Sequence, residues 1–419
     1  MKKNKLTPYE KSWILYDVGN SAFTMLVATL IPIYFNGLAE GAGIGSADYL
    51  AYWGYAGSIA TLAVALIGPI FGTLADRKNT KKTVFLIALA VGALGCALMG
   101  FAQSWLLFLV VFVIAKIGYS SSLVFYDAML PEVTTQDRMD DVSSKGYAYG
   151  YIGSCIPFIL CLALVLFYEQ LHISISTAMI AAFLITVIWW VGTSVPLLRR
   201  YRQTAYIEKT DRPFRQTFSR LWSTLKSAGK EKHIFLFLLA FFFFIDGVYT
   251  IIDMATAYGA ALGLDTNGLL LALLLTQFVA FPFSILFGRL ASKYDTGLLI
   301  KICILAYTGI TVFAFFLASS WQFWTLAVLV GMFQGGIQAL SRSYFAKIIP
   351  AEQSGEYFGI YDICGKGASF LGTTLVGVVS QATGKMNLGV GAIVFIFILG
   401  FFFFCKADAC AREKIKMTM

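Results

Sequence analysis

The feature that most constrains this chain is a series of apolar runs separated by polar segments. A helix needs roughly 20 apolar residues to cross a bilayer. Inside the bilayer such a run must be helical, because the helix satisfies its own backbone polar groups without water. Twelve runs meet this length, at about residues 12–38, 50–75, 83–102, 104–130, 142–168, 174–197, 233–260, 268–290, 298–318, 321–348, 355–381 and 386–405. We therefore expect an all-α membrane protein with twelve transmembrane helices.

The composition supports a membrane protein and excludes several other classes. Apolar residues make up 58% of the 419 residues and charged residues 13%, whereas soluble domains have about 45–50% and about 25%. A soluble globular chain, a disordered chain and a fibrous chain are therefore excluded. The seven cysteines are scattered without the spacing of a zinc site, so we expect buried thiols and no metal centre.

One long polar segment divides the apolar runs into two sets of six. It covers residues 198–232, between the sixth and seventh runs. The division predicts an N-terminal six-helix bundle at 1–197, a basic cytoplasmic linker at 198–232, a C-terminal six-helix bundle at 233–405 and a cytoplasmic tail at 406–419.

The basic residues predict the orientation of the chain. Of the 32 Lys and Arg residues, all except Lys116 and Lys385 lie in segments that fall on one side when the spans alternate. Because cytoplasmic loops carry an excess of Lys and Arg, we expect both termini and the linker in the cytoplasm of a bacterial cell with this protein in its inner membrane. The net charge of +9 is then a topology signal, and no nucleic-acid partner is expected. The linker is interpreted as a tether, with an anionic-lipid or partner site as the alternative.

The two sets of six runs repeat several short motifs in the same order. Tyr16-Asp17-Val18-Gly19 in the first run corresponds to Ile245-Asp246-Gly247 in the seventh. Gly72-Thr-Leu-Ala-Asp76-Arg77 follows the second run, and Gly288-Arg-Leu-Ala-Ser-Lys293 follows the eighth. Two parallel six-helix repeats about an axis along the membrane normal describe the major facilitator arrangement. This pattern predicts two pseudo-symmetric bundles.

The first of these loops also resembles the loop motif of the major facilitator superfamily, although it departs from that motif at Asn79 and Thr80. A narrower resemblance covers nearly the whole chain. The sequence is similar to the vacuole-effluxer-like family in the segments Trp13-x-x-Tyr-Asp-x-Gly-Asn-Ser-Ala-Phe23, Phe125-Tyr-Asp-Ala-Met-Leu-Pro-Glu132, Ser144-Lys-Gly-Tyr-Ala-Tyr-Gly150, Gln338-Ala-Leu-Ser-Arg-Ser343 and Phe358-Gly-Ile-Tyr-Asp362. Fungal members of that family are described as vacuolar amino-acid exporters. The resemblance implies the facilitator fold and transport of an amino acid or a related metabolite.

Polar side chains inside the runs mark a candidate transport pathway. The third, sixth, ninth and twelfth runs hold no charge in their interiors, and the facilitator fold places those spans on the outside. A charge at the bilayer centre costs roughly 2.5–3.5 kcal/mol on insertion scales, so buried charges need partners or a wet cavity. The candidate substrate and ion pathway comprises Asp17, Asn20, Lys116, Asp246, Thr250, Asp253, Gln334, Gln338, Asp362 and Lys366.

Several of these residues also have structural interpretations. Asp362 and Lys366 are four residues apart and can neutralise each other on one helix face. Asp17 lies near the start of its run. This position suits a gating or helix-capping role as well as it suits proton transport. Lys116 lies deep in its run and needs a counter-charge or loses its proton, which favours a place in a cavity.

A second set of residues is predicted to act in gating near the cytoplasmic ends of the spans: Gly72, Asp76, Arg77, Asp127 and Arg342. Asp76 and Arg77 can bridge to helix ends of the other half in one state of the transport cycle. Glycines four residues apart, such as Gly68 and Gly72, let helix backbones approach closely, either for sliding or for tight packing.

The seventh run suggests a coupling mechanism. Asp246 and Asp253 lie on it with Thr250 between them, and it holds no cation after His233. We expect Asp246 to carry a coupling proton, Asp253 to support it, and Lys116 to supply a counter-charge in one state only. The alternative is a permanent ion pair between the halves.

An enzyme is not expected. The two histidines, His172 and His233, lie at opposite ends of the spans, so no Ser-His-Asp set can form, and no GxxxxGK[ST] loop is present for nucleotide hydrolysis. We expect a monomeric secondary transporter, surrounded by membrane lipids, that moves a small polar solute by alternating access and proton-coupled efflux without a cofactor. The alternatives are a lipid or glycolipid translocase and a non-transporting receptor or scaffold, which needs no charges at depth.

Overall fold

The computed structural model describes residues 5–208, 231–261, 266–317 and 319–418, which are almost entirely helical. The first half contains α1 (Pro8–Ala28), α2 (Leu30–Gly41), α3 (Ser46–Ala75), α4 (Lys81–Met99), α5 (Trp105–Ala128), α6 (Leu130–Val133), α7 (Met139–Leu166) and α8 (Ile175–Arg200). The second half contains α10 (Lys232–Ala261), α11 (Thr266–Ala291), α12 (Thr296–Phe315), α13 (Ser320–Ile348), the short 3-10 helix η1 (Ala351–Gln353), α14 (Ser354–Thr383) and α15 (Met386–Thr418).

The helices follow the predicted runs. Eleven stretches of the described chain are long and apolar enough to cross a membrane. The eleventh predicted run, 355–381, is not among them, but it corresponds to α14, whose 30 residues extend about 45 Å at the helical rise. The first run comprises both α1 and α2, because the helix is interrupted at Thr29, where φ is −133° and ψ is −82°.

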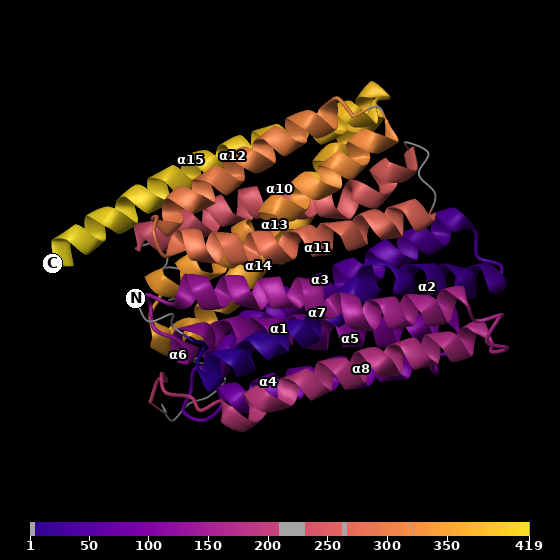
Figure 1. Cartoon of the computed structure of the whole chain (residues 1–419), viewed down its shortest axis with the longest axis horizontal. Coiled ribbons are helices and arrows are strands. Elements are labelled where there is room, and N and C mark those ends of the chain that lie inside the picture. The colour runs from indigo at the N-terminus through magenta and orange to yellow at the C-terminus, as the bar shows by residue number, and fades with distance from the viewer. Residues whose placement is uncertain (1–4, 209–230, 262–265, 318, 419) are drawn as a thin grey trace.

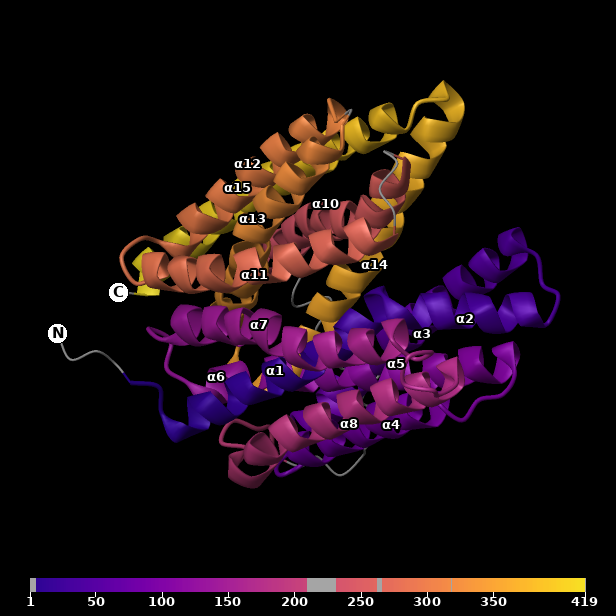
Figure 2. The ribbon, with the colours of Figure 1, turned by 45° about the vertical axis from the view of Figure 1, so that its right-hand side comes forward.

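The two halves pack side by side with their helices roughly along one direction (Figure 1). The start of α1 and the end of α15 lie at the same end of the bundle. We call this end the terminal end and the opposite end the distal end. Away from the terminal end, the helices of the two halves diverge (Figure 2).

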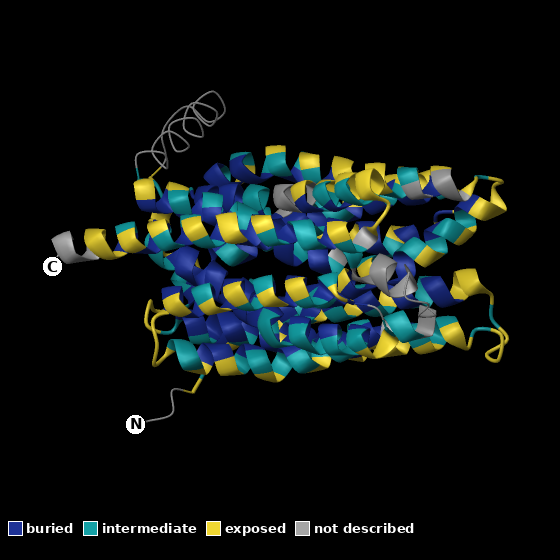
Figure 3. Cartoon of the chain, turned by 90° about the horizontal axis from the view of Figure 1, so that it is seen from above, coloured by how far each residue is buried: buried dark blue, intermediate teal, exposed yellow. Residues whose placement is uncertain are grey.

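The outer surface of the bundle carries many apolar side chains, on helices that alternate between buried and exposed positions (Figure 3). Helices α4, α8, α12 and α15 expose large examples: Leu94, Ile188, Leu305 and Phe395. Contiguous apolar surface of this kind is unfavourable in water and suits lipid. These four helices are the spans whose interiors were predicted to hold no charge.

The predicted C-terminal tail is a continuation of a helix. Helix α15 runs to Thr418, so residues 406–418 extend the last span beyond the predicted limit at 405. Asp408 stabilises this extension by accepting a hydrogen bond from Lys301 of α12 at 2.6 Å, and Arg412 donates to Asp295 at 2.6 Å. The run of apolar residues ends at 405, but these ion pairs continue the packing of α15 against α12.

The start of the predicted linker binds the first half. Gln203 accepts a hydrogen bond from the backbone N–H of Thr80 at 3.1 Å, and the N–H of Ile207 donates to the carbonyl oxygen of Asp76 at 2.8 Å. Ile207 also forms an isolated bridge with Arg77. Residues 201–208 are therefore held against the loop that follows α3, whereas residues 209–230 of the linker lie outside the described residues.

Candidate transport pathway

A cavity of about 570 Å³ lies between the two halves. Helices α1, α3, α5 and α7 line it from the first half, and α10, α11, α13 and α14 line it from the second. Within the described chain, none of the lining residues comes from α4, α8, α12 or α15. The four spans predicted to lie on the outside are thus the four that contribute no described residue to the cavity wall.

The cavity wall combines both signs of charge with aromatic rings. It includes six residues of the predicted pathway, namely Asp17, Asn20, Lys116, Gln334, Gln338 and Asp362. Sequence reasoning missed the aromatic part of the wall, which includes Trp53, Tyr119, Tyr147, Tyr151, Tyr249 and Tyr361. Such rings are hard to recognise in a chain with 37 Phe and 21 Tyr, because most aromatic residues there serve packing. The side chains of Asp253 and Lys366 lie outside the described residues.

An arginine cluster closes the cavity toward the terminal end. Arg342 on α13 donates hydrogen bonds to Asp127 on α5 at 3.0 Å and to Asp17 on α1 at 3.3 Å. It also donates to Ser143 on α7, at 2.9 Å to the hydroxyl and at 3.0 Å to the carbonyl oxygen. One side chain of the second half therefore binds three helices of the first. We call Arg342, Asp17, Asp127 and Ser143 the arginine cluster.

Charge pairing and aromatic contacts compensate for the burial of this cluster. Arg342 is 2% exposed and Asp17 is 5% exposed. Removal of one partner of a buried ion pair typically destabilises a protein by about 3–5 kcal/mol, because the other charge stays buried. The rings of Trp13 and Tyr147 lie 4.7 and 4.3 Å from the guanidinium carbon, at distances that favour a cation–π interaction. The guanidinium group thus has aromatic partners as well as carboxylate partners.

The loop motif makes a second contact between the halves. Asp76, directly after α3, accepts hydrogen bonds from the backbone N–H groups of Gly355 at 2.8 Å and Glu356 at 2.9 Å. These groups begin α14, where a helix has unpaired N–H donors and favours an anion. Lys81 lies 3.6 Å from Asp76 and 2.7 Å from Glu132. The loop after α3 thereby holds the start of α14 against the first half.

The protonation of Asp76 affects this contact. Burial raises the pKa of the Asp76 carboxyl to about 7, while Lys81 and the two backbone N–H groups act in the opposite direction. A protonated oxygen is a weaker acceptor than a carboxylate oxygen. We therefore expect the contact between Asp76 and α14 to weaken as the pH falls through about 7.

Glycine allows α3 and α14 to meet beside this contact. A Cβ atom at Gly72 would lie 2.3 Å from the carbonyl oxygen of Gly355, and a Cβ at Gly355 would lie 2.6 Å from the carbonyl oxygen of Gly72. Any side chain at either position would force the two helices apart. Gly72, a predicted gating residue, thus lies where the halves approach most closely along these helices.

A third contact was missed by sequence reasoning. Asp140, at the start of α7, accepts hydrogen bonds from Thr296 on α12 at 2.7 Å and from Ser343 on α13 at 2.6 Å, and it pairs with Lys347. The predicted fifth span begins at residue 142, which leaves Asp140 in a loop. An acidic residue in the first turn is typical of a helix N-terminus, and that signal would have extended the span to include it.

Asp246 and Thr250 lie outside the cavity, contrary to expectation. Ile245 and Tyr249 line the cavity, whereas Asp246 accepts a hydrogen bond from the backbone N–H of Gly372 on α14. One residue turns a helix by about 100°, so a helix that faces the cavity still directs other side chains elsewhere. The described residues hold no salt bridge between Asp246 and Lys116, the pair that the sequence suggested.

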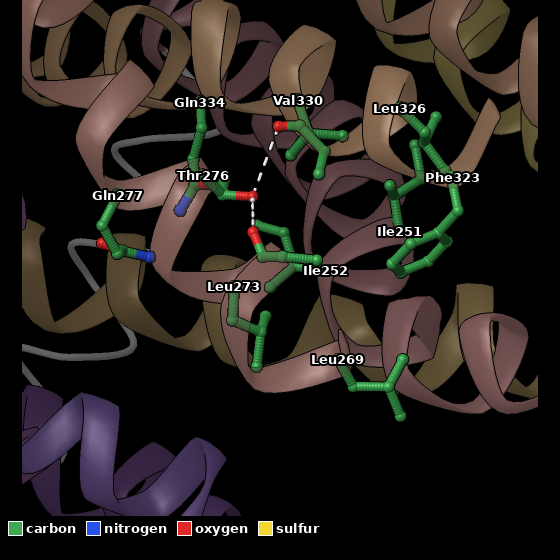
Figure 4. Close-up of a pocket in the computed structure, with 12 residues that line it drawn as sticks. Ile251, Ile252, Leu269, Leu273, Thr276, Gln277, Phe323, Leu326, Val330 and Gln334 are labelled. Atoms are coloured by element: carbon green, nitrogen blue, oxygen red, sulfur yellow. Dashed lines mark hydrogen bonds between the residues drawn. The ribbon is translucent and has the colours of Figure 1, made fainter. Parts of the chain in front are cut away.

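A smaller, mainly apolar pocket of about 60 Å³ adjoins the cavity within the second half (Figure 4). Ile252, Gln277 and Gln334 line both spaces. The amides of Gln277 and Gln334 lie at one end of the pocket, and Leu326 and Phe323 lie at the other (Figure 4). The pocket therefore places apolar surface next to the polar cavity.

Two six-helix halves with a polar cavity between them define a membrane transporter of the major facilitator class. Solved structures of this class share the fold. The E. coli fucose:proton symporter FucP matches with a TM-score of 0.71 and 16% identity, over 96% of this chain and 97% of that chain. The human organic anion transporter MFSD10 matches with a TM-score of 0.69 and 14% identity, over 94% of this chain and 98% of that chain.

Within that class, the chain belongs to the vacuole effluxer Atg22-like family, whose model matches residues 45–413. The uncharacterized MFS-type transporter YxiO of Bacillus subtilis is 42% identical over 401 residues, which cover 94% of each chain. Autophagy-related protein 22-1 of Aspergillus fumigatus is 28% identical over 292 residues, which cover 62% of this chain and 46% of the fungal protein. The predicted family resemblance and the all-α facilitator fold are confirmed.

Proposed function

We propose that this transporter exports an amino acid or a closely related zwitterionic metabolite by proton-coupled alternating access, as a monomer in a bacterial inner membrane. The cavity is the observation that supports this proposal. Its wall carries the carboxylates of Asp17 and Asp362 and the cations of Lys116 and Arg342, so groups of both signs border the space that a zwitterion would occupy. Its volume of about 570 Å³ lies within the range of small-molecule sites.

The adjoining pocket supports a solute with an apolar group. Ile252 and Gln334 connect it with the cavity, so a solute can keep its charged groups in the cavity and place a small side chain in the pocket. The volume of about 60 Å³ exceeds the roughly 10–15 Å³ that a single water molecule needs in a cavity. A small apolar side chain is the kind of group that suits this space.

The charge pattern supports the proposed direction. We place the terminal end in the cytoplasm because the loops there carry most of the Lys and Arg residues. In the state described, the arginine cluster, the Asp76 contact and the Asp140 contact then separate the cavity from the cytoplasm. Export requires these contacts to open for loading and to form again for release.

An exchange assay in reconstituted vesicles tests the proposal. Vesicles loaded with a mixture of unlabelled amino acids should take up a subset of labelled ones by exchange, and a pH gradient should drive net accumulation. Lys116→Met, which removes a cavity charge, should lower the exchange rate by about tenfold, the effect of one charged hydrogen bond. Arg199→Ala, at an exposed position of α8, is the control and should exchange at the wild-type rate. Movement of labelled phospholipid without amino-acid exchange would contradict the proposal and favour the lipid-translocase alternative.

A further inference from the structure

We propose that Asp246 and Thr250 form a proton-binding site at the interface of α10 and α14, apart from the solute cavity. The inference rests on the proposed proton coupling and names the place where the proton binds. It differs from the mechanism that the sequence suggested, because the site does not include Lys116 and does not lie between the halves.

The contacts of Asp246 leave one of its oxygens free. The side chains of Asp246 and Thr250 are both fully buried. Asp246 Oδ1 accepts a hydrogen bond from the backbone N–H of Gly372 at 3.0 Å, whereas Asp246 Oδ2 and Thr250 Oγ1 have no hydrogen-bond partner among the described residues. Buried polar atoms are nearly always hydrogen-bonded in folded proteins. Two such atoms near each other therefore indicate a bound species that supplies the missing interaction.

Gly372 allows these two atoms to pack closely against the backbone of α14. A Cβ atom at Gly372 would lie 2.1 Å from Thr250 Oγ1 and 2.9 Å from Asp246 Oδ2. Both free oxygens thus lie beside the same glycine, where a side chain would displace them. Gly372 therefore serves both as a hydrogen-bond donor to Oδ1 and as the residue whose lack of a side chain lets Oδ2 and Thr250 Oγ1 lie together.

A proton is the cation that suits these oxygens. A buried carboxylate without a counter-charge is unfavourable, and protonation removes the charge. Once protonated at Oδ2, the carboxyl group becomes a donor, for which Thr250 Oγ1 is an acceptor on the same helix face. Metal ions such as Ca²⁺ or Mg²⁺ take about six or more oxygen ligands, while the described residues offer two free oxygens here. The N–H of Gly372 at Oδ1 also disfavours a metal cation on that side.

The charged groups that the structure describes on the neighbouring helices have other positions or partners. On α14, Asp362 lines the cavity and Lys366 has a side chain outside the described residues. On α13, Arg342 binds the first half. On α15, Phe397 is the neighbour that packs against Gly247, next to Asp246. On α12, the buried Tyr307 has a free hydroxyl, and on α11 the cation Arg289 lies at the terminal end.

The position of the site relates it to the cavity. Asp246 follows Ile245 and Thr250 follows Tyr249, and both preceding residues line the cavity wall. Helix α14, which supplies Gly372, also lines the cavity through Tyr361 and Asp362. A rotation of α10 by about one residue, roughly 100°, would bring the carboxyl group into the cavity. Protonation of Asp246 thus favours its buried position, and ionisation favours exposure to the cavity.

Infrared difference spectroscopy on the purified full chain in lipid tests the site directly, without a known solute. Lowering the pH should produce the carbonyl bands of protonated carboxyl groups in the wild type, with Asp76 among them. Asp246→Asn should lack the band that belongs to Asp246, whereas Asp76→Asn should keep this band. Thr250→Val and Gly372→Ala should shift the Asp246 band, because the first removes the acceptor and the second displaces the two oxygens. Gly377→Ala, on the same helix with no neighbouring atom within 4 Å of its Cβ, is the matched control and should leave the band unchanged.

The outcomes separate the site from its alternatives. An unchanged band in Asp246→Asn would overturn the inference, and if that variant does not fold, an unchanged band in Thr250→Val would do so. Lys366→Met should keep the band. Loss of the band in this variant would show that Lys366 controls the protonation of Asp246, and it would overturn the proposed site. Replacement of choline chloride by sodium chloride at constant pH should also keep the band, and its loss would identify a sodium site instead.

Transport then separates this inference from the proposed function. With a labelled amino acid that the wild type exchanges, Asp246→Asn should keep exchange and lose accumulation driven by a pH gradient. If the wild type itself does not accumulate solute, the proposed coupling is wrong, and the infrared result still decides whether Asp246 binds a proton. If the wild type and Asp246→Asn accumulate solute equally, the inferred site is wrong while the proposed function stands.

Discussion

Arg342 shows how a single residue connects the halves of this transporter. Its guanidinium group binds carboxylates on α1 and α5 and the hydroxyl and carbonyl oxygen of Ser143 on α7. A planar group with five donors can satisfy these directions together, whereas an ammonium group cannot. The sequence predicted Arg342 and Asp127 as gating residues, but it did not predict that Asp17 would share their contact.

Arg342→Ala should reduce stability strongly. The change leaves Asp17 and Asp127 without their shared cation, so we expect a loss of about 3–5 kcal/mol in the free energy of unfolding. Arg342→Lys should recover part of this loss, because it restores the charge without the planar geometry. Thermal unfolding in detergent measures both effects. Arg199→Ala, at an exposed position, should change stability by less than about 0.5 kcal/mol, and an equal loss in that control would refute this account of Arg342.

The sequence predicted which polar residues lie inside the membrane spans. It predicted less well whether each of their side chains faces the cavity. Asp17, Lys116 and Asp362 line the cavity as expected, because most polar positions of inner helices face an aqueous space. Asp246 does not, since α10 packs against α14 on one side and borders the cavity on another. Hydrophobic pattern alone cannot distinguish these two sides, because both are shielded from lipid.

At the scale of helices, the approach of α3 and α14 determines how closely the halves can pack at the terminal end. The sequence predicted most spans because length and apolar composition are sufficient to define a membrane helix. It placed the end of the last helix too early, at residue 405, because α15 continues through ion pairs and small buried alanines, which do not lengthen the apolar run. Close backbone contact between Gly72 and Gly355 was predictable only as a possible use of paired glycines.

Gly72→Ala should disfavour the state that is closed at the terminal end. The new methyl group would lie 2.3 Å from the carbonyl oxygen of Gly355, so α3 and α14 must separate. A cysteine introduced at Ser21, which lines the cavity, should then react faster with a thiol reagent added at the terminal end, in a background without the native cysteines. Gly54→Ala, on the same helix with open space at its Cβ, is the matched control. Equal labelling rates in the two variants would refute the role of this contact.

At the scale of the whole molecule, several polar contacts between described residues join the halves near the terminal end. The arginine cluster lies in the cavity wall, whereas the Asp76 and Asp140 contacts lie at helix ends. Asp76 binds the start of α14, whereas Asp140 at the start of α7 binds Thr296 and Lys347. The two contacts are related by the pseudo-symmetry of the halves, although the residues that make them differ.

The Asp76 and Asp140 contacts should contribute independently to closure. Asp76→Asn and Asp140→Asn should each shift the balance toward the state open at the terminal end by about 1–3 kcal/mol, because each leaves buried donors unsatisfied. The contacts share no partner, so the double variant should show the sum of the two shifts within about 0.5 kcal/mol. The equilibrium labelling of the Ser21 cysteine measures these shifts. A double variant no more open than either single one would show that the halves do not move as units.

The Asp76 contact also has a consequence for how sequences in this family can diverge. On the first half the contact depends on one side chain, but on the second half it depends on the main-chain N–H groups of Gly355 and Glu356. Most substitutions cannot delete a main-chain donor. Point mutations that abolish this contact should therefore accumulate at position 76 and rarely at 356, and relatives that have lost the carboxylate should retain the unused donors at the start of the eleventh span. In such relatives, a single reversion at position 76 is sufficient to restore the contact.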